Sequence, residues 1–317
     1  MIKTKLTDLL GIQYPVFQGA MAWIADGELA AAVSEAGGLG IIGAGNAPPS
    51  WVADQIRRAR ELTDKPFGVN LALISTYVDE LADLLVADPV AVITTGAGNP
   101  GKYIARWEAV GTKVIPVVPS VALAKRAEKE GAAAVIAEGG ESGGHIGELN
   151  TMALVPQVVD AVDIPVLAAG GIGDGRGVAA ALMLGAEGVQ MGTRFIVATE
   201  CNVHPNYKQK ILAAKDRETI TTGNRLGHPV RCLKTPFSRS LAAREADENT
   251  SIEELETIGV GALRRAAVEG DLERGCFMSG EIAGLVTREQ SAAEIVTELF
   301  CEAEALLTVR AQELVRA

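Results

Sequence analysis

Short apolar segments alternate with helical segments eight times between about residues 15 and 196, and this repeat constrains the fold more than any other feature. Strands separated by helices form parallel sheets, and strands that are apolar on both faces are buried on both faces. Eight such units predict an α/β protein whose sheet closes into a (β/α)8 barrel, the TIM-barrel fold. The expected strands are 15–21, 39–45, 66–73, 90–98, 113–120, 133–139, 164–171 and 187–195.

The alternation stops after the eighth unit, yet too many residues remain for a single closing helix. We therefore predict three parts: a barrel core over 1–198, a cap or insertion over 199–290, and a C-terminal helix over 291–317 that packs on the barrel. The cap is expected to cover the barrel mouth or to form a subunit interface.

A glycine-rich loop, AEGGESGGHIGEL over 137–149, follows the sixth expected strand and carries one histidine, His145. Glycines let the main chain approach a ligand closely, and ligands bind at the carboxyl ends of barrel strands. His145 is therefore a candidate catalytic group beside a flat ligand. The alternative is that the glycines only permit a turn and that His145 is a surface residue. The loop has no cysteine and no second histidine, which argues against a metal site or a thiol nucleophile.

The loops after the seventh and eighth strands are AAGGIGDG and QMGTRF. In this fold these two loops often hold a phosphate through backbone amides. Gly170, Gly171, Gly192 and Thr193 are the candidate phosphate-binding residues, with ordinary turn glycines as the alternative. Two other glycine patterns do not fit their motifs: Gly38, Gly40 and Gly43 lack the strand before and helix after them, and GAGNPGK is followed by a tyrosine.

The net charge of -11 argues against nucleic acid or anionic membranes as partners. No apolar run is long enough to span a bilayer and no signal-peptide core is present, so we expect a cytoplasmic protein. One segment departs from the acidic average: eight Lys and Arg residues stand against two acids in 207–239. The basic residues are Lys208, Lys210, Lys215, Arg217, Arg225, Arg231, Lys234 and Arg239.

An ordered set of motifs runs through nearly the whole chain: YPVFQGAMAW, SEAGGLGIIGAGNAP, KPFGVNLAL, TTGAGNP, ESGGHIG, AAGGIGDG, VQMGTRF and HPNYKQKIL. This set resembles the flavin-dependent enoyl-acyl-carrier-protein reductases of type II, which are relatives of the nitronate monooxygenases. Each motif alone is weakly specific, and their order is what carries the resemblance.

The resemblance implies a TIM barrel that binds FMN and is reduced by NADH or NADPH, with a monovalent cation as a further possible requirement, and a homodimer. The family's functional histidine falls on His145. The family often has QGGM where this chain has QGAM, so one contact with the flavin ring falls on Ala20 in place of glycine. The residues implied to contact FMN are Ala20, Met21, Asn70, Glu138, Gly143, Gly170, Gly171, Gln190, Gly192 and Thr193.

The implied reaction is reduction of a trans-2-enoyl thioester on acyl carrier protein, the last step of bacterial fatty-acid elongation. His145 would donate a proton or hydrogen-bond the developing oxyanion, and the basic segment 207–239 would dock the acidic carrier protein. His204 and His228 are expected to be structural, although His228 lies in the basic segment and has substrate contact as an alternative. A nitronate monooxygenase and a non-redox flavin-binding or phosphate-binding barrel are the competing functions. An IMP dehydrogenase-like barrel is disfavoured because no cysteine precedes residue 200.

Overall fold

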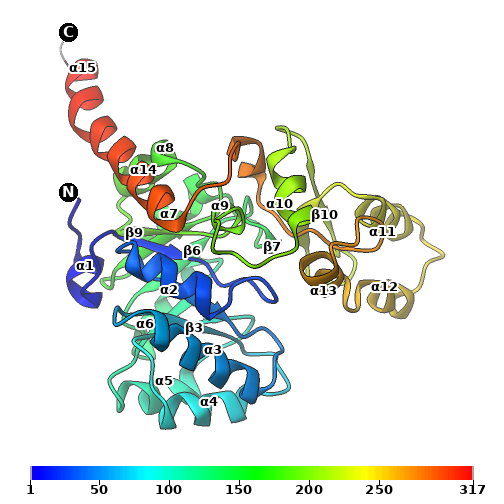
Figure 1. Cartoon of the computed structure of the whole chain (residues 1–317), viewed down its shortest axis with the longest axis horizontal. Coiled ribbons are helices and arrows are strands. Elements are labelled where there is room, and N and C mark those ends of the chain that lie inside the picture. Colours follow the sequence, from blue (N-terminus) through cyan, green and yellow to red (C-terminus); the bar gives the residue numbers. More distant parts are fainter. Residues whose placement is uncertain (1, 316–317) are drawn as a thin grey trace.

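The computed structural model describes residues 2–315, and its main sheet has eight parallel strands in the order β1-β9-β8-β6-β5-β4-β3-β2. The edge strands meet through Leu39, whose carbonyl accepts from Gln18 N at 3.0 Å and whose N–H donates to Val16 O at 2.9 Å. The predicted (β/α)8 barrel is therefore confirmed (Figure 1). The strands are β1 Val16–Gln18, β2 Ile41–Gly43, β3 Gly68–Ala72, β4 Val92–Gly96, β5 Lys113–Val118, β6 Val135–Glu138, β8 Val166–Ala169 and β9 Gly188–Met191.

A side-chain amide completes the barrel at its closure. Gln18 is fully buried, and its Oε1 accepts from Ile41 N at 3.1 Å while its Nε2 donates to Ile41 O at 3.2 Å. The amide thus takes the place of a peptide group between β1 and β2, where the short strands do not pair directly. Buried backbone groups need such partners, because leaving one unpaired costs roughly 1–3 kcal/mol.

The helices that follow the strands cover the outside of the barrel (Figure 1). Asp26 caps the first of them by accepting from Glu28 N at 3.1 Å and Leu29 N at 2.9 Å. The covering helices are α2 Gly27–Glu35, α3 Pro49–Leu62, α4 Val78–Ala87, α5 Gly101–Glu108, α6 Val121–Lys129, α7 Thr151–Val159 and α8 Gly175–Met183, and α1 Lys5–Leu10 precedes β1.

Apolar side chains fill the interior of the barrel below the mouth, so this part is a packed core and not a channel. Side chains alternate between the two faces of a strand, and the inward positions nearest the amino ends are large and apolar. Fully buried examples are Phe17, Ile41, Val92, Ile115, Ile136 and Leu167.

The expected eighth strand, 187–195, is too long. The strand ends at Met191, and the four-residue helix α9 Thr193–Ile196 follows, because Gly192 adopts helical angles and its carbonyl accepts from Phe195 N at 2.9 Å.

The regular alternation of strands and helices stops after the barrel, as predicted, but the cap contains strands that the sequence analysis did not identify. The hairpin β10 Thr219–Thr222 and β11 Val230–Leu233 lies in the cap. The two-residue strand β7 Gly144–His145, which comes from the glycine loop, pairs with β11 and extends this small sheet. The other cap elements are α10 Pro205–Leu212, α11 Pro236–Ala246, α12 Ile252–Gly259, α13 Ala262–Arg264, the π-helix η1 Arg265–Glu269 and the 3₁₀-helix η2 Glu281–Leu285.

The chain returns from the cap next to the point where it left. Ala198 forms a parallel bridge with Gln290, and Thr199 N donates to Gln290 O at 2.9 Å. The helix α14 Ala292–Ala305 then packs on the barrel: Phe300 stacks on Tyr14 with ring centroids 5.0 Å apart, and Glu302 accepts from Gly175 N at 2.8 Å. These contacts are consistent with the division into 1–198, 199–290 and 291–317, which stays a prediction.

The chain continues from α14 into the π-helix η3 Leu306–Arg310 and the last helix, α15 Ala311–Val315. Within residues 2–315, no helix has the length and apolar character needed to cross a membrane.

Candidate active site

A polar tier lies above the apolar core, at the carboxyl ends of the strands. Asn70 pairs with Thr94 in the β3–β4 register, and its Nδ2 donates to Thr94 Oγ1 at 3.0 Å. Glu138 pairs with Ala169, which pairs with Gln190 in the next strand. By strand alternation all four polar side chains share the inward face with the apolar core below them. The barrel is therefore sealed by apolar side chains and lined by hydrogen-bonding groups at its mouth.

The carboxyl of Glu138 is a weaker acid than an ordinary glutamate. Burial raises the pKa of its carboxyl from 4.5 to about 7. The nearby Ser142 hydroxyl opposes the rise, although that buried hydroxyl makes no hydrogen bond of normal geometry to any described residue. A carboxyl that is half-ionised near neutral pH, in the mouth of a barrel, is a feature of functional sites.

His145 is held in the cap sheet and does not lie in a free loop. It pairs with Val230 of β11, and the next residue, Ile146, donates its N–H to Pro229 O at 3.0 Å. The His145 side chain is exposed, and its pKa is lowered from 6.5, mainly because surrounding protein atoms displace water and secondly because of His228. The structure thus brings the two histidines close enough to interact and places a neutral imidazole at the site at pH 7.

Several cap residues fix the conformation of the glycine loop. The Arg231 guanidinium donates twice to Gly140 O, at 3.1 and 3.0 Å, and pairs with Glu281 at 3.0 Å. A Cβ atom at Gly143 would lie 2.6 Å from the carbonyl carbon of Ser279, closer than real Cβ atoms approach. Gly143 is therefore required by close packing against the cap, and its exposed side is open to a ligand.

The predicted phosphate-binding residues lie beside the contact between Gly143 and Ser279. Gly170 and Gly171 have φ of +88° and +70°, conformations that favour glycine. The Thr193 hydroxyl accepts from Gly280 N at 2.9 Å, which leaves its own proton available to an acceptor. Among residues 2–315, the amides of Gly171, Gly192 and Thr193 donate to no partner, so they are free to bind an anion.

Two residues after the first strand, Ala20 and Met21, complete the set of residues around the barrel mouth. A Cβ atom at Gly43 would lie 2.8 Å from the carbonyl carbon of Met21, and one at Gly192 would lie 3.6 Å from Met21 Sδ. Ala20 and Met21 therefore lie between the second strand and the loop after the eighth. All the residues that the sequence resemblance implies for FMN thus belong to the barrel mouth or its loops. Their individual roles remain predictions.

Sequence reasoning missed four residues at this site: Thr94, Arg231 as a loop anchor, Ser279 and Gly280. The TTG at the end of the fourth strand was a signal for Thr94, since it lies where inward polar residues face a ligand. No local pattern marks the other three, because each lies 87 or more positions from the residue that it contacts: Arg231 from Gly140, Ser279 from Gly143 and Gly280 from Thr193. Within the described chain, no three His, Cys, Asp or Glu side chains are grouped to hold a metal ion.

A closed parallel barrel with a polar mouth, a histidine above it and free amides for an anion defines a (β/α)8-barrel enzyme. A family model described as nitronate monooxygenase matches residues 3–302. The chain belongs to this family and is an oxidoreductase of that group.

Individual relatives cover the chain almost completely. The structure of FabK from Thermotoga maritima is 51% identical with a TM-score of 0.95, covering 98% of this chain and 100% of that one. A (3aS,4S,5R,7aS)-5-hydroxy-7a-methyl-1-oxo-octahydro-1H-indene-4-carboxyl-CoA dehydrogenase of Rhodococcus jostii is 35% identical, covering 95% of this chain and 96% of the relative. A probable nitronate monooxygenase of Staphylococcus saprophyticus is 32% identical, covering 96% and 99%.

Proposed function

We propose that the protein is an FMN-dependent enoyl-acyl-carrier-protein reductase, which uses NADH or NADPH to reduce trans-2-enoyl thioesters. The observation that carries the proposal is that His145, in the loop after β6, is fixed in the cap sheet by its pairing with Val230. The resemblance of the motifs to the type II reductases and the 51% identity with FabK support the same function. The homodimer, the cytoplasmic location and a monovalent cation belong to the proposal as well.

The residues at the mouth fit FMN. Asn70, Glu138 and Gln190 would bind the polar edge of the flavin ring, with Ala20 and Met21 against the ring. Free amides at Gly171, Gly192 and Thr193 would hold the phosphate, since backbone N–H groups and hydroxyls are the usual phosphate donors. When bound, FMN would supply hydride chemistry between the reduced nicotinamide and the β carbon of the enoyl thioester.

His145 would act on the oxygen of the thioester. Reduction at the β carbon develops negative charge on that oxygen, and a fixed hydrogen-bond donor stabilises it. Because the pKa of His145 is lowered, the neutral imidazole with its N–H is the form present at pH 7. This favours the role of hydrogen-bond donor over that of proton donor.

The first experiment follows the flavin anaerobically. The purified enzyme is reduced with NADH and then mixed with crotonyl thioester in a stopped-flow instrument. Rapid reoxidation of the flavin without oxygen is the expected result. Reduction by NADH without reoxidation by the thioester would contradict the proposal.

A nitronate monooxygenase is the second candidate, favoured by the name of the family model and by the staphylococcal relatives. The same instrument distinguishes it, because an alkyl nitronate in place of the thioester would then give turnover that requires oxygen. Such turnover with no activity on enoyl thioesters would replace the first function with this one.

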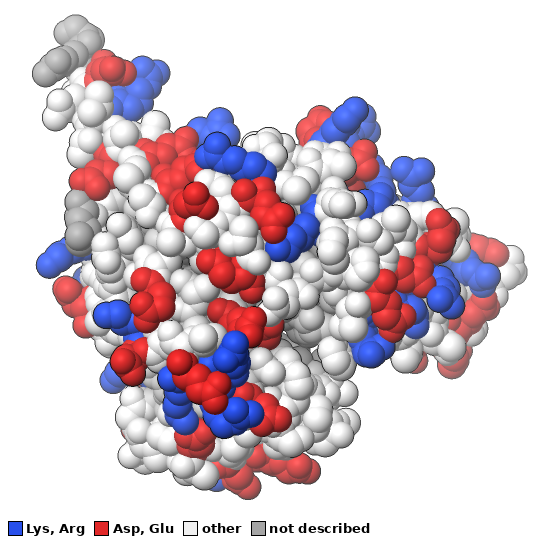
Figure 2. Space-filling model, viewed as in Figure 1, with Lys and Arg blue, Asp and Glu red and all other residues white. Residues whose placement is uncertain are grey.

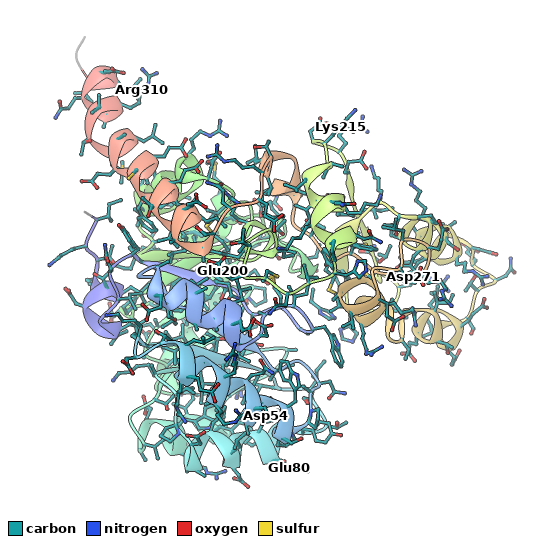
Figure 3. The ribbon with its side chains drawn as sticks, viewed as in Figure 1. Asp54, Glu80, Glu200, Lys215, Asp271 and Arg310 are labelled. Carbon is teal, nitrogen blue, oxygen red and sulfur yellow. The ribbon has the colours of Figure 1, made fainter. Side chains whose placement is uncertain are left out.

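Several basic residues of the segment 207–239 are already bound within the protein, so fewer are available to an acyl carrier protein. Lys208 is largely buried and pairs with Glu289 at 2.6 Å, while Arg225 donates to the carbonyls of Glu245, Asp247 and Thr250. Arg231 and Lys234 also bind protein oxygens. The side chains of Lys210, Lys215, Arg217 and Arg239 have no ion-pair or hydrogen-bond partner among the described residues, and basic side chains follow the upper edge of the cap, where Lys215 lies (Figures 2 and 3). Lys210, Lys215 and Arg217, which are close together in the chain, are the proposed docking cations.

Reversal of Lys210, Lys215 and Arg217 to glutamate is expected to raise the KM for crotonyl-acyl-carrier-protein about tenfold. The acidic carrier would be repelled, and the effect would weaken as salt screens the charges. The KM for crotonyl-CoA should change little. Reversal of Lys125 and Lys129, exposed cations on the barrel helix α6, is the matched control. An equal rise for both thioesters, or for the control variant, would contradict docking at the cap edge.

A further inference from the structure

A second pocket lies where the barrel meets the cap, beyond the loop that carries Ala20 and Met21. Its volume is about 290 Å³, close to the lower end of the range of roughly 300–1,000 Å³ for small-molecule sites. It comes from four separate parts of the chain: the loop after β1, the first turns of α3, the start of the cap, and the α13–η1 segment. We call this the junction pocket. The lining residues used below are Trp23, Trp51, Gln55, Asn202 and Arg264.

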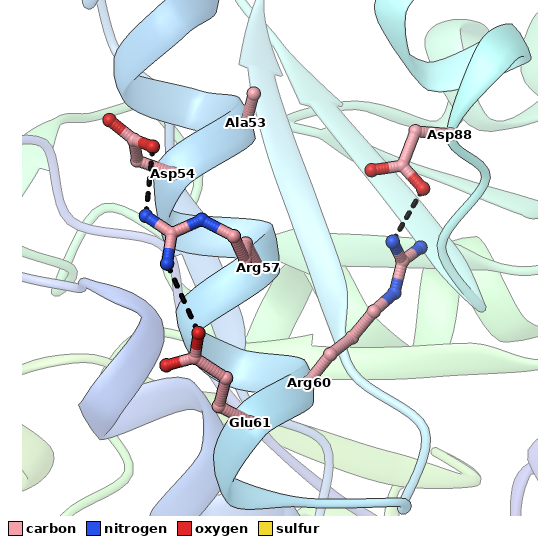
Figure 4. A pocket seen from close by; sticks show the side chains of 6 residues that line it. All are labelled: Ala53, Asp54, Arg57, Arg60, Glu61 and Asp88. Atoms are coloured by element: carbon pink, nitrogen blue, oxygen red, sulfur yellow. Dashed lines mark hydrogen bonds and ion pairs between the residues drawn. The ribbon is translucent and has the colours of Figure 1, made fainter.

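A larger groove of about 490 Å³ on the outer helices does not have the chemistry of a ligand site (Figure 4). Its charged side chains already pair with one another: Arg57 with Asp54 at 3.0 Å and with Glu61 at 3.1 Å, and Arg60 with Asp88. The groove contains no aromatic side chain and no unpaired amide. It therefore serves as a control surface.

Trp23 is held in the junction pocket at a conformational cost. Its φ is +65°, which is rare for a bulky residue, and 46% of the side chain is exposed. The turn is fixed by Ile24 N and Ala25 N, which both donate to Met21 O at 3.0 and 2.8 Å. The Arg264 guanidinium lies 5.7 Å from the ring centroid. Strain of this kind persists where the surroundings impose it, and it concentrates at functional sites.

The lining of the junction pocket also contains one hydrogen-bond donor and one hydrogen-bond acceptor that have no partner among the described residues. Gln55 Oε1 accepts from Gly27 N at 2.9 Å, which leaves its NH2 group without a described partner. Asn202 Nδ2 donates to Asp26 at 3.0 Å and Glu28 at 2.7 Å, which leaves its Oδ1 without one. The flat faces are therefore indole, and the polar edge offers an N–H and a carbonyl oxygen.

We propose that the junction pocket binds the adenine ring of an adenine coenzyme. Adenine has a flat π-face for stacking on indole and guanidinium, and its edge presents ring-nitrogen acceptors next to an amino donor, which side-chain amides recognise. The two charged lining residues, Asp26 and Arg264, are opposite in sign, and Arg264 is already paired with Glu269 at 2.6 Å, so the pocket suits a neutral base better than a phosphate.

This inference rests on the proposed function for the choice of coenzyme. Two coenzymes of the proposed reaction assay carry adenine: the nicotinamide dinucleotide and the CoA of a CoA thioester. The pocket begins two residues beyond Met21, so a coenzyme anchored there could extend toward the barrel mouth.

The direct test is calorimetric titration of the flavin-loaded enzyme with ADP, which needs no turnover. Trp23→Gly is the test variant, because it removes the indole and places at φ +65° the residue that tolerates it. We expect ADP to bind the wild type and the variant to bind at least about tenfold more weakly, given the usual contribution of base stacking. Arg57→Ala in the outer groove should bind ADP like the wild type. Absence of saturable ADP binding, or equal affinity in Trp23→Gly, would overturn the proposal.

Steady-state kinetics then identify the coenzyme. A KM that rises about tenfold for NADH in Trp23→Gly, but not for crotonyl-CoA, assigns the pocket to the reductant. A KM that rises for crotonyl-CoA and not for crotonyl-pantetheine, which lacks adenine, assigns it to CoA. No change in any of these KM values would overturn a coenzyme role. If enoyl thioesters prove not to be substrates, the ADP titration still decides the adenine site by itself.

Discussion

Replacement of His145 by alanine is expected to lower turnover of an enoyl thioester by roughly 10²–10³-fold, the usual cost of losing a positioned acid, base or oxyanion donor. The flavin should remain bound, because the residues proposed to hold its ring and phosphate lie on the barrel strands and the loops after them, and the substitution leaves Gly143 unchanged. The measurement is kcat with crotonyl thioester together with the visible absorbance of the purified variant.

The structure explains why this variant should fold. The pairing of His145 with Val230 uses backbone groups only, and alanine keeps them. The imidazole is exposed, so its removal leaves no internal cavity. His204→Asn is the matched control, since His204 caps α10 by accepting from Asn206 N at 3.1 Å and asparagine is a good cap. Near wild-type turnover in His145→Ala would refute the catalytic assignment.

The pH profile separates the two roles of His145. If the neutral imidazole donates a hydrogen bond, activity rises as pH increases through the lowered pKa of His145, so the rise is centred below the pH at which a free imidazole titrates. If the imidazolium donates a proton, activity falls over the same range. Because His228 contributes to lowering the pKa of His145, His228→Ala should raise that pKa and shift the change in activity toward higher pH.

The barrel could be predicted because its signal is local and repeated. Each strand is a short apolar run followed by a helix, and eight repeats leave one closed architecture. The error at 187–195 has the same origin: QMGTRF continues the apolar alternation, and only the helical angles of Gly192 end the strand. The β10–β11 hairpin was missed because its strands, TITT and VRCL, are short and half-buried, without a clear alternation of apolar and polar residues.

The side chains at the barrel mouth were easier to identify than the cap residues above them. The family resemblance implied Asn70, Glu138 and Gln190, and the structure places all three at ends of strands, which a parallel barrel brings to one face. The contacts of Arg231 with Gly140 O and of Ser279 with Gly143 join distant parts of the chain through packing alone. No periodicity encodes such contacts, so the strand that holds His145 over the mouth could not be foreseen from the loop sequence.

Replacement of Glu138 by glutamine is expected to remove a pH-dependent loss of stability. A carboxyl whose pKa is higher in the folded than in the unfolded chain stabilises the fold when protonated, and this contribution is complete below pH 4.5 and lost as pH rises toward about 7. A difference of about 2.5 in pKa corresponds to at most about 3.5 kcal/mol, since each pKa unit is worth about 1.4 kcal/mol. The wild type should therefore lose free energy of unfolding between pH 5 and 8 that Glu138→Gln retains.

Urea unfolding of the flavin-free protein at pH 5, 6, 7 and 8, followed by circular dichroism, measures this difference. The free energies of unfolding of wild type and variant should be similar near pH 5 and diverge toward pH 8, with the variant the more stable there. Glu148→Gln is the same change at an exposed position of the same loop, and its free energy of unfolding should depend on pH as that of the wild type does. Parallel curves for Glu138→Gln would mean that the buried carboxylate finds compensating partners, and Glu138 would then titrate as an ordinary surface acid does.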